Sequence, residues 1–449
     1  MRPELSWLKS RKSLIFSSLV DFLIFNILFA ITFKEYILNK SIFYFLSTSN
    51  SLIWIILSYI VGRYGLIISN KINLFLRNSI QSSLTIFFSL FLFLTQFRVF
   101  WNWDYMNFDS FSNFINFISN FYVKLFIFSN FFQIILSYFF SIKYVKKTHW
   151  LFLGTYERMK ELEKFIGKKL NFEIQLYSPK SLNLNEYSGN GIIVDDESIA
   201  EEKNIQLIFT LKNKGLKIMK ISNWCERYLN KYPSQLIKFN EIIGGQFSYD
   251  ESSLRGRLKR IAETVISLSI LIITLPLLIT ASLLIKLEDN GPIFYSQIRN
   301  GFGGKPFRII KLRTMNIDAE NDGEQWSKKD DKRITNIGRV LRKLRVDELP
   351  QLLLVINGQM SLIGPRPERP NIDKFLRQKI PNYDLRYSIK PGISGWAQVN
   401  YPYGASLDDS KYKLSYDLFY IKNFSIFLDI MILIQTIKIV FNAKGSKPN

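Results

Sequence analysis

The sequence predicts a membrane protein of mixed α and α/β class, with a four-helix transmembrane bundle, a Rossmann-like α/β domain and a monotopic, mainly α domain. Three observations support this class. Residues 1–147 contain four apolar stretches, residues 148–250 alternate between strand-like and helix-like segments, and residues 251–449 open with a long apolar segment interrupted by proline. These three ranges are the predicted domains.

Composition restricts the chemistry that this chain can perform. Of 449 residues, 47% are hydrophobic and 15% aromatic, and 59 Lys and Arg outnumber 37 Asp and Glu to give a formal net charge of +22. Cys225 and His149 are the only residues of their types. These counts exclude an internal disulfide, a Cys-rich zinc site and Ser-His-Asp or Cys-His catalysis. Any catalysis must therefore use carboxylates, lysine, arginine and backbone groups.

The apolar stretches of the first domain have the length expected of membrane spans. They cover residues 14–33, 51–61, 80–97 and 121–140. A helix that crosses the hydrocarbon core needs roughly 20 residues, which the second stretch reaches only if residues 42–45 or 66–68 join it. No small-residue cleavage site follows the first stretch, so a cleavable signal peptide is not expected.

Charges in the connections predict the orientation of these spans. Basic residues precede the first span, separate the second from the third and follow the fourth: Arg2, Lys9, Arg11, Lys12, Arg63, Lys71, Arg77, Lys143, Lys146 and Lys147. The alternate connections hold fewer basic residues, and acids oppose them: Lys34, Lys40 and Arg98 against Glu35, Asp104 and Asp109. The positive-inside rule places both ends of the bundle in the cytoplasm.

The second domain has the pattern of a parallel α/β sheet. Residues 150–153, 172–177, 191–194 and 205–210 are expected to be strands, and residues 156–170 a helix. Of the glycines in a dinucleotide fingerprint only Gly154 is present, which favours a structural or dimerising domain over one that binds a dinucleotide. We interpret the acidic run Asp195-Asp196-Glu197 as a solvated turn and not as a metal site.

The third domain opens with residues 265–285, which carry no charge and have Pro276 at their midpoint. Basic residues flank both sides of this stretch: Arg255, Arg257, Lys259, Arg260 and Lys286. Basic flanks indicate that both ends stay in the cytoplasm, so a re-entrant helical hairpin broken at Pro276 is favoured over a fifth span.

A final apolar stretch covers residues 424–441. Its apolar residues follow helical spacing, but polar residues interrupt them: Asp429, Gln435, Thr436 and Lys438. This pattern favours a helix that lies in the membrane interface over one that crosses the bilayer. The whole third domain would then rest on one leaflet.

Several motifs of unusual composition lie between these apolar elements. In order they are GPIFYSQIRNG (291–301), KLRTM (311–315), Arg342, Arg345, DELPQL (347–352), SLIGPRPE (361–368) and KPGISGWAQVN (390–400). Arginine and lysine beside few carboxylates, without histidine, suit phosphate binding. An adjacent Asp-Glu pair can divide two tasks, one carboxylate acting as nucleophile and the other holding Mg²⁺. Each motif alone is compatible with ordinary surface charge, but their ordered series is not.

In this order the motifs resemble those of the polyprenyl-phosphate hexose-1-phosphate transferases, membrane enzymes that start the assembly of bacterial surface glycans. The resemblance covers residue 254 to the C-terminus, and residues 1–250 resemble the additional domains of the long members, which start O-antigen, capsule or exopolysaccharide synthesis. It implies transfer of hexose-1-phosphate from a UDP-sugar to undecaprenyl phosphate, with release of UMP, through a covalent aspartyl phospho-sugar.

The resemblance also implies roles for individual residues. Asp347 would be the nucleophile and Glu348 a ligand of the Mg²⁺ cofactor. The implied phosphate-binding residues are Lys311, Arg313, Arg342 and Arg366, and the implied additional site residues are Asp417, Pro365 and Pro367. The role of Arg345 stays open between phosphate contact and a solvated helix face. Two departures concern membrane geometry: Leu275 precedes Pro276 where serine is frequent, and Glu263 stands where aspartate is usual.

The resemblance and the charges agree on location and partners. A bacterial inner membrane protein with its second and third domains in the cytoplasm would meet UDP-sugars, undecaprenyl phosphate and the bilayer, and a homodimer is expected. The basic charge lies largely beside apolar segments, which favours lipid headgroups and diphosphates over nucleic acid as partners. The alternatives are a membrane-anchored ligand-binding sensor or scaffold without transferase activity and, with less support, a transporter.

Overall fold

The computed structural model describes residues 12–37, 39–61, 63–64, 71–99, 111–144, 148–166, 172–176, 189–195, 202–213, 215–237, 239–319, 331–401, 404 and 406–441. The chain forms two compact units. One contains residues Trp7–Thr148 and Asn171–Glu173, and the other contains most of the α/β segment together with the remainder of the chain to the C-terminus. The predicted three-domain boundaries stay a prediction.

Four long helices make up the first unit: α2 (Lys12–Phe33), α3 (Lys40–Val61), α4 (Lys71–Val99) and α5 (Phe111–Tyr144). Each predicted apolar stretch lies within one of them, and the second is lengthened by residues 42–45, as the sequence allowed. The helices share an aromatic core that includes Phe25, Trp54, Phe93 and Phe121. In the described part of the chain, these four helices and α11 of the second unit are long and apolar enough to cross a membrane.

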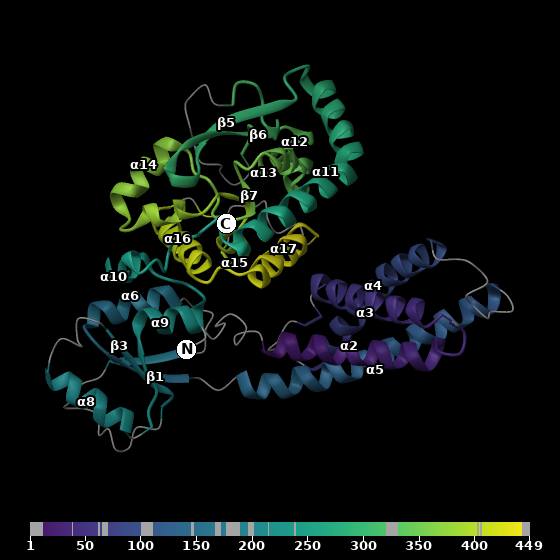
Figure 1. The fold of residues 1–449 in the computed structure, drawn as a ribbon, viewed down its shortest axis with the longest axis horizontal. Helices are drawn as coiled ribbons and strands as arrows, with labels where there is room; N and C mark the ends of the chain where they lie inside the picture. Colours follow the sequence, from purple (N-terminus) through teal and green to yellow (C-terminus); the bar gives the residue numbers. More distant parts are fainter. Residues whose placement is uncertain are drawn as a thin grey trace. The chain divides into compact units, whose positions relative to one another are not determined.

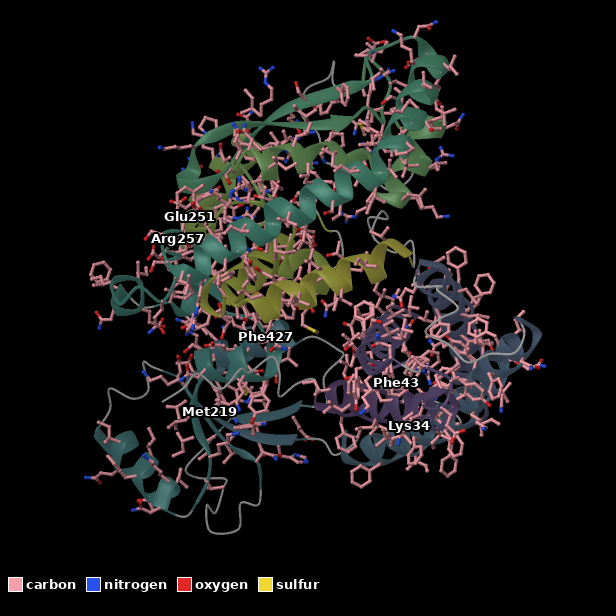
Figure 2. The ribbon with its side chains drawn as sticks, turned by 45° about the vertical axis from the view of Figure 1, so that its right-hand side comes forward. Lys34, Phe43, Met219, Glu251, Arg257 and Phe427 are labelled. Carbon is pink, nitrogen blue, oxygen red and sulfur yellow. The ribbon has the colours of Figure 1, made fainter. Side chains whose placement is uncertain are left out.

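Aromatic packing and buried polar contacts, among them the ion pair between Asp21 and Arg63, hold this unit together. Figure 2 shows Phe43 among the aromatic side chains of the unit, and its ring centroid lies 5.5 Å from that of Phe29. Many of the residues used to predict orientation lie outside the described residues: Arg2, Lys9, Arg11, Asp104, Asp109, Lys146 and Lys147. Arg63 is described, and it is buried beside Asp21.

The α/β segment contains a four-stranded sheet in the order β2-β1-β3-β4. Its elements are β1 (Thr148–Leu153), α6 (Tyr156–Ile166), β2 (Phe172–Leu176), β3 (Gly191–Val194), α8 (Glu202–Asn213), β4 (Ile218–Lys220), α9 (Ile221–Trp224) and the π-helix η2 (Cys225–Leu229). Strand β3 pairs in parallel with β1 and with β4, which agrees with the predicted parallel sheet. Figure 1 shows helices packed around this sheet.

Two predictions for this segment are wrong. Residues 205–210 belong to helix α8, because Ile208 and Leu211 pack on one helical face against the core formed by β1 and β3. Asp195 is not solvated: it is 3% exposed and lies 3.9 Å from Arg158. Its backbone N–H donates to the Leu153 carbonyl, so it extends β3 into the sheet instead of leaving it. Asp196 and Glu197 lie outside the described residues.

The remainder of the second unit is mainly helical. Its elements are η3 (Ser234–Leu236), α10 (Phe239–Ile243), α11 (Leu254–Asp289), β5 (Phe294–Asn300), η4 (Phe302–Gly304), β6 (Pro306–Leu312), α12 (Asn336–Leu344), η5 (Val346–Gln351), α13 (Leu352–Ile356), β7 (Ser361–Ile363), α14 (Pro370–Lys379), η6 (Tyr383–Ser388), β8 (Gly392–Ser394), α15 (Trp396–Asn400), α16 (Leu407–Lys422) and α17 (Ile426–Phe441). Strands β5 and β6 form an antiparallel hairpin, and β7 pairs in parallel with β8.

The prediction of a re-entrant helical hairpin broken at Pro276 needs one correction, because the helix is not broken at the proline; that both of its ends lie on the same side of a membrane stays a prediction. Helix α11 runs through Pro276 as one 36-residue helix, and Figure 1 shows that it bends part-way along. A proline removes one helical hydrogen bond and bends the axis without having to reverse the chain. Side-chain hydroxyls bond to backbone carbonyls on both sides of the proline, from Thr274 to Ile270 and from Thr280 to Pro276.

Candidate active site

Asp347 and Glu348 lie on the short helix η5, between α12 and α13. Their neighbours in sequence, Val346 and Leu349, face the opposite way and pack in a core with residues of α11, β6 and α12. This apolar packing holds η5 in position, and with it the two carboxylates, which lie next to each other on the same short helix. The predicted pairing of these acids is therefore built into the fold of this segment.

Three cations hold the carboxylate of Glu348. Its Oε1 accepts from Lys311 Nζ at 3.2 Å and from Arg366 Nη2 at 2.7 Å, while Oε2 accepts from Arg345 Nη1 at 3.0 Å. Burial alone would raise the pKa of Glu348, but the charges of Arg366, Lys311 and Arg345 hold that pKa well below its usual range. Glu348 is thus ionised across the physiological pH range, and it contacts basic residues from β6, from the junction between α12 and η5, and from the loop after β7.

Asp347 is in a different electrostatic state, although it is adjacent. It is 8% exposed, and its carboxylate makes no hydrogen bond or ion pair with any residue in the described part of the chain. Burial, together with the charge of Glu348, raises the pKa of Asp347 to about 6, against the opposing charges of Lys311, Arg342 and Arg345. A buried carboxylate without hydrogen bonds is poorly stabilised and has free lone pairs, as a nucleophile requires.

Arg342 and Arg313, both predicted to bind phosphate, lie in different surroundings. Arg342 donates from Nε to Thr314 Oγ1 at 2.8 Å, and its charge acts on Asp347. Arg313 is not brought into the site. It forms a two-pronged ion pair with Asp289 at the end of α11 and donates from Nε to the Pro292 carbonyl at 2.7 Å. Strand β6 ends at residue 312, so the alternation that would place Arg313 beside Lys311 no longer applies.

The loop that carries Arg366 is held by its backbone. Four consecutive carbonyls accept hydrogen bonds from four separate donors: Pro365 from the Gly392 N–H, Arg366 from the Arg386 guanidinium, Pro367 from the Arg299 guanidinium and Glu368 from the Asn300 N–H. Prolines at 365 and 367 further restrict the chain on both sides of Arg366. The predicted Pro365 and Pro367 thus act on the placement of the arginine between them.

Asp417 reaches this loop indirectly. It is 3% exposed on α16, and its Oδ2 lies 3.2 Å from Arg386 Nη2, the same group that donates to the Arg366 carbonyl at 2.7 Å. Burial raises the pKa of Asp417 to about 6, with the charge of Arg386 opposing the rise. Asp417 therefore positions Arg386, and Arg386 positions the loop of Arg366.

Glu263, the residue that departs from the family pattern, supports the strand before this loop. Its Oε1 accepts from the Ser361 hydroxyl and from the Leu362 and Ile363 N–H groups, and it lies 3.2 Å from Lys259 Nζ. The glutamate thus ties α11 to β7. Pro276 lies 13 residues further along α11 and takes no part in these contacts.

Sequence reasoning left Arg345 open and did not select Arg299 or Arg386. Arg299 belongs to the motif GPIFYSQIRNG (291–301), so it could have been selected from the sequence. Arg386 lies outside every quoted motif, and only the fold brings it to the Arg366 carbonyl. Arg345 contacts Glu348, so it is not merely part of a solvated helix face, and its contact with phosphate stays a prediction; local sequence cannot reveal the contact with Glu348 because α12 ends immediately before Arg345.

Asp347 and Glu348 are the carboxylates of this site that could hold the Mg²⁺ predicted from the sequence. No group of three or more His, Cys, Asp and Glu side chains that could hold a metal occurs among the residues described. Mg²⁺ is commonly bound through one or two carboxylates, with substrate phosphates completing its coordination. The oxygens of Asp347 and Glu348 suit such a substrate-assisted site, although both oxygens of Glu348 already accept from cations.

Comparison with known proteins identifies the family. Residues 254–443 match the family described as bacterial sugar transferase. A UDP-glucose:undecaprenyl-phosphate glucose-1-phosphate transferase of Caulobacter vibrioides is 39% identical over 181 residues, which are 40% of this chain and 68% of that protein. This chain belongs to the bacterial sugar transferase family. The family predicted from the motif series is thereby confirmed.

Two further relatives of this sugar transferase show how the similarity is distributed. A UDP-N-acetylgalactosamine-undecaprenyl-phosphate N-acetylgalactosaminephosphotransferase of Aeromonas hydrophila is 47% identical over 173 residues, 38% of this chain and 41% of the relative. A UDP-glucose:undecaprenyl-phosphate glucose-1-phosphate transferase of Escherichia coli is 36% identical over 188 residues, 41% of this chain and 40% of the relative. The chain thus matches less than half the length of these two proteins.

Proposed function

We propose that this sugar transferase moves a hexose-1-phosphate or an acetamidohexose-1-phosphate from a UDP-sugar to undecaprenyl phosphate and releases UMP. The names of the relatives support this reaction class and include both glucose and N-acetylgalactosamine. The observation that carries the proposal is the contrast within the acid pair: Asp347 is buried without a hydrogen-bond partner among the described residues, beside a Glu348 that gathers three cations.

The first step uses Asp347 as a nucleophile. One carboxylate oxygen attacks the phosphorus that bears the sugar, an oxygen–phosphorus bond forms, and the phosphorus–oxygen bond to UMP breaks with its electron pair leaving on UMP. Lys311, Arg342 and Arg366 offset the charge of the diphosphate, because phosphoryl transfer depends mainly on positioning and charge neutralisation. The product of this step is an aspartyl phospho-sugar.

The second step regenerates the enzyme. A phosphate oxygen of undecaprenyl phosphate attacks the same phosphorus, and the bond to Asp347 breaks to restore the carboxylate. The sugar is then linked to the lipid through a diphosphate. No proton is gained or lost over the cycle, which agrees with a site built from carboxylates and cations without histidine.

Mg²⁺ is the cofactor that we propose for this site. Glu348 would hold it through a carboxylate oxygen, with substrate phosphates supplying further ligands. When bound, the ion would neutralise negative charge on the diphosphate and on the leaving UMP.

The proposed setting is the bacterial inner membrane. Helices α2 to α5 would cross the bilayer, both ends of α11 would stay on the cytoplasmic face, and α17 would lie in the interface, so that the second unit is monotopic. UDP-sugars are cytoplasmic and the phosphate of undecaprenyl phosphate lies at headgroup depth. The reaction would be the first membrane step of O-antigen, capsule or exopolysaccharide synthesis.

The test measures UMP release by the full chain in nanodiscs, with Mg²⁺, undecaprenyl phosphate and a panel of UDP-sugars. We expect release with one class of donor and a loss of at least about a thousandfold in Asp347→Asn. The exposed acid Asp408, at the start of α16, supplies the control Asp408→Asn, which should keep full activity.

A second measurement isolates the covalent step. With a UDP-sugar and no lipid acceptor, the protein should release about one UMP per chain and gain the mass of the phospho-sugar, and Asp347→Asn should do neither. UMP release that always requires both substrates, without a mass increase, would rule out the aspartyl intermediate. Tight binding of a nucleotide sugar without any release would instead support the ligand-binding sensor.

A further inference from the structure

The two oxygens of Glu348 are not equivalent. Oε1 accepts from both Lys311 and Arg366, whereas Oε2 accepts from Arg345 alone among the described residues. A divalent cation that binds Glu348 must displace at least one of these groups from an oxygen. Oε2 is the oxygen where a single displacement suffices, and Arg345 is the residue that has to move.

Exposure favours the movement of Arg345 over that of Lys311. The Arg345 side chain is 28% exposed and borders solvent, while the Lys311 side chain is 19% exposed and rises from β6 inside the site. A long, partly exposed arginine can leave one carboxylate oxygen without opening a cavity in the core. The Arg366 side chain is 38% exposed, but four consecutive carbonyls of its loop, at residues 365–368, accept hydrogen bonds that hold the loop in place.

The backbone of Arg345 shows that this residue is held in an unusual conformation. Its φ of 56° and ψ of 24° lie in the left-handed region, where it ends α12 and begins η5. The other described non-glycine residues with positive φ are all asparagines: Asn230, Asn290 and Asn382. Asparagine tolerates this conformation and arginine does not favour it. The guanidinium, which reaches Glu348 three residues later, distinguishes this position from the other three.

The balance of charge in the site, to which Arg345 contributes, opposes binding of a metal ion before the substrate arrives. When Asp347 is ionised, four cations face two carboxylates, a formal surplus of two positive charges: Lys311, Arg342, Arg345 and Arg366 against Asp347 and Glu348. A metal ion alone would increase this surplus, whereas a divalent cation together with a donor diphosphate adds no net charge. The site therefore resists the bare metal ion and accepts it together with the donor.

We propose that Arg345 occupies the metal-binding position on Glu348 Oε2 in the resting enzyme, and that it moves to a phosphate oxygen of the donor when a divalent cation takes that position. This inference rests on the metal use in the proposed function. It makes Arg345 both a substitute for the cation in the empty site and a donor-binding residue in the loaded one. No covalent bond changes in this exchange.

The test measures Mn²⁺ binding by electron paramagnetic resonance on the full chain in nanodiscs, without nucleotide. Arg345→Asn removes the charge but keeps a residue that tolerates the left-handed backbone, so we expect it to fold and to bind Mn²⁺ on the order of tenfold more tightly than the wild type. Arg345→Lys keeps the charge and should bind Mn²⁺ like the wild type. Arg339→Gln, which alters an exposed arginine of α12, is the matched control and should change nothing.

A kinetic readout completes the test. Arg345→Asn should raise the KM for the UDP-sugar at saturating Mg²⁺, because the donor loses a phosphate contact, and should lower the Mg²⁺ concentration that gives half-maximal activity. Mn²⁺ affinity that is unchanged or weaker in Arg345→Asn would overturn the role proposed for Arg345, but not the metal use of the site. Absence of Mn²⁺ binding in every variant, with and without UDP-sugar, together with activity in excess chelator, would overturn the metal use on which the inference rests.

Discussion

Both compact units bury a carboxylate near cations, and the two carboxylates differ in how completely they are satisfied. In the helical bundle, Asp21 is fully buried and accepts from Arg63 at 3.2 Å, from Tyr64 at 2.8 Å and from Ser129 at 2.6 Å. In the second unit, Asp347 is almost as buried but accepts no hydrogen bond from the described residues. Asp21 has the contacts of a structural group, whereas the lack of contacts at Asp347 among the described residues suits the reactive role proposed for it.

The same contrast holds for the cations. The Arg63 guanidinium donates hydrogen bonds to Asp21, Ser58 and Ser129. It also lies 5.1 Å from the centre of the Trp54 ring, and all of these partners belong to the first unit. In the second unit, Lys311, Arg345 and Arg366 instead contact Glu348, and none of the described residues pairs with Asp347. A paired buried charge stabilises one conformation of the fold. An unpaired buried charge lowers the stability of the fold, and such destabilised groups are found at functional sites.

The largest expected effect on stability comes from Asp21→Asn. Loss of this charge leaves Arg63 buried without a counter-charge, which should cost about 3 kcal/mol of unfolding free energy. Thermal unfolding of the full chain in detergent measures this loss. The double variant Asp21→Asn with Arg63→Met should recover part of it, because it removes both charges. An Asp21→Asn protein as stable as the wild type would remove the distinction between the two carboxylates.

The substitution Asp347→Asn should raise the free energy of unfolding, whereas Asp21→Asn should lower it. The pKa of Asp347 is raised from an unfolded value of about 3.8 to about 6, so folding favours the protonated form and the ionised form destabilises the native state. The asparagine variant should therefore be more stable than the wild type by about 1–3 kcal/mol above pH 6, and this advantage should shrink as the pH falls from about 6 to 4. Parallel melting curves at pH 8 and pH 4.5 check both the sign and the pH window.

The pH dependence of catalysis should follow the same group. In the proposed mechanism only ionised Asp347 attacks phosphorus, so kcat/KM should fall about tenfold for each pH unit below 6 and level off above it. Burial raises the pKa of Asp417 to about 6 as well, so Asp417→Asn is the necessary comparison. If kcat/KM of Asp417→Asn still falls below pH 6, the fall is assigned to Asp347. If kcat/KM of Asp417→Asn no longer depends on pH, the fall is assigned to Asp417.

The long apolar elements could be predicted from the sequence because their apolar periodicity is local, whereas the short strands and helices between residues 294 and 422 were not predicted. The four long helices, strands β1 to β3 and the adjacent acids of η5 all follow from residue spacing. The failures arise where a short apolar run fits two periods. Residues 205–210 form a short apolar run that resembles a strand, but Ile208 and Leu211 contact the sheet core from a helix. Local sequence cannot arbitrate between these two packings.

The candidate site was predicted in its residue types more fully than in its pairings. Lys311 and Arg366, which were predicted to bind phosphate, both contact Glu348, whereas Arg313, predicted for the same role, pairs with Asp289. That difference depends on where β6 ends and on how close the end of α11 lies. Arg345 and Arg386 acquire their contacts from chain reversals that only the fold supplies.

The smallest expected effect tests whether the Asp21 cluster is a single structural unit. The hydroxyl of Ser129 donates to Asp21 Oδ1 at 2.6 Å and accepts from Arg63 Nη2 at 2.7 Å, so Ser129→Ala leaves one acceptor and one donor unsatisfied. The ion pair between Asp21 and Arg63 remains, so the loss should be about 1 kcal/mol, well below that of Asp21→Asn. Ser119, an exposed serine of the same helix α5, supplies the control Ser119→Ala, which should be close to neutral. Equal melting temperatures for the two serine variants would mean that Asp21 is held by Arg63 and Tyr64 alone. A clear difference would show that its stability is shared among all three partners, the arrangement that Asp347 lacks.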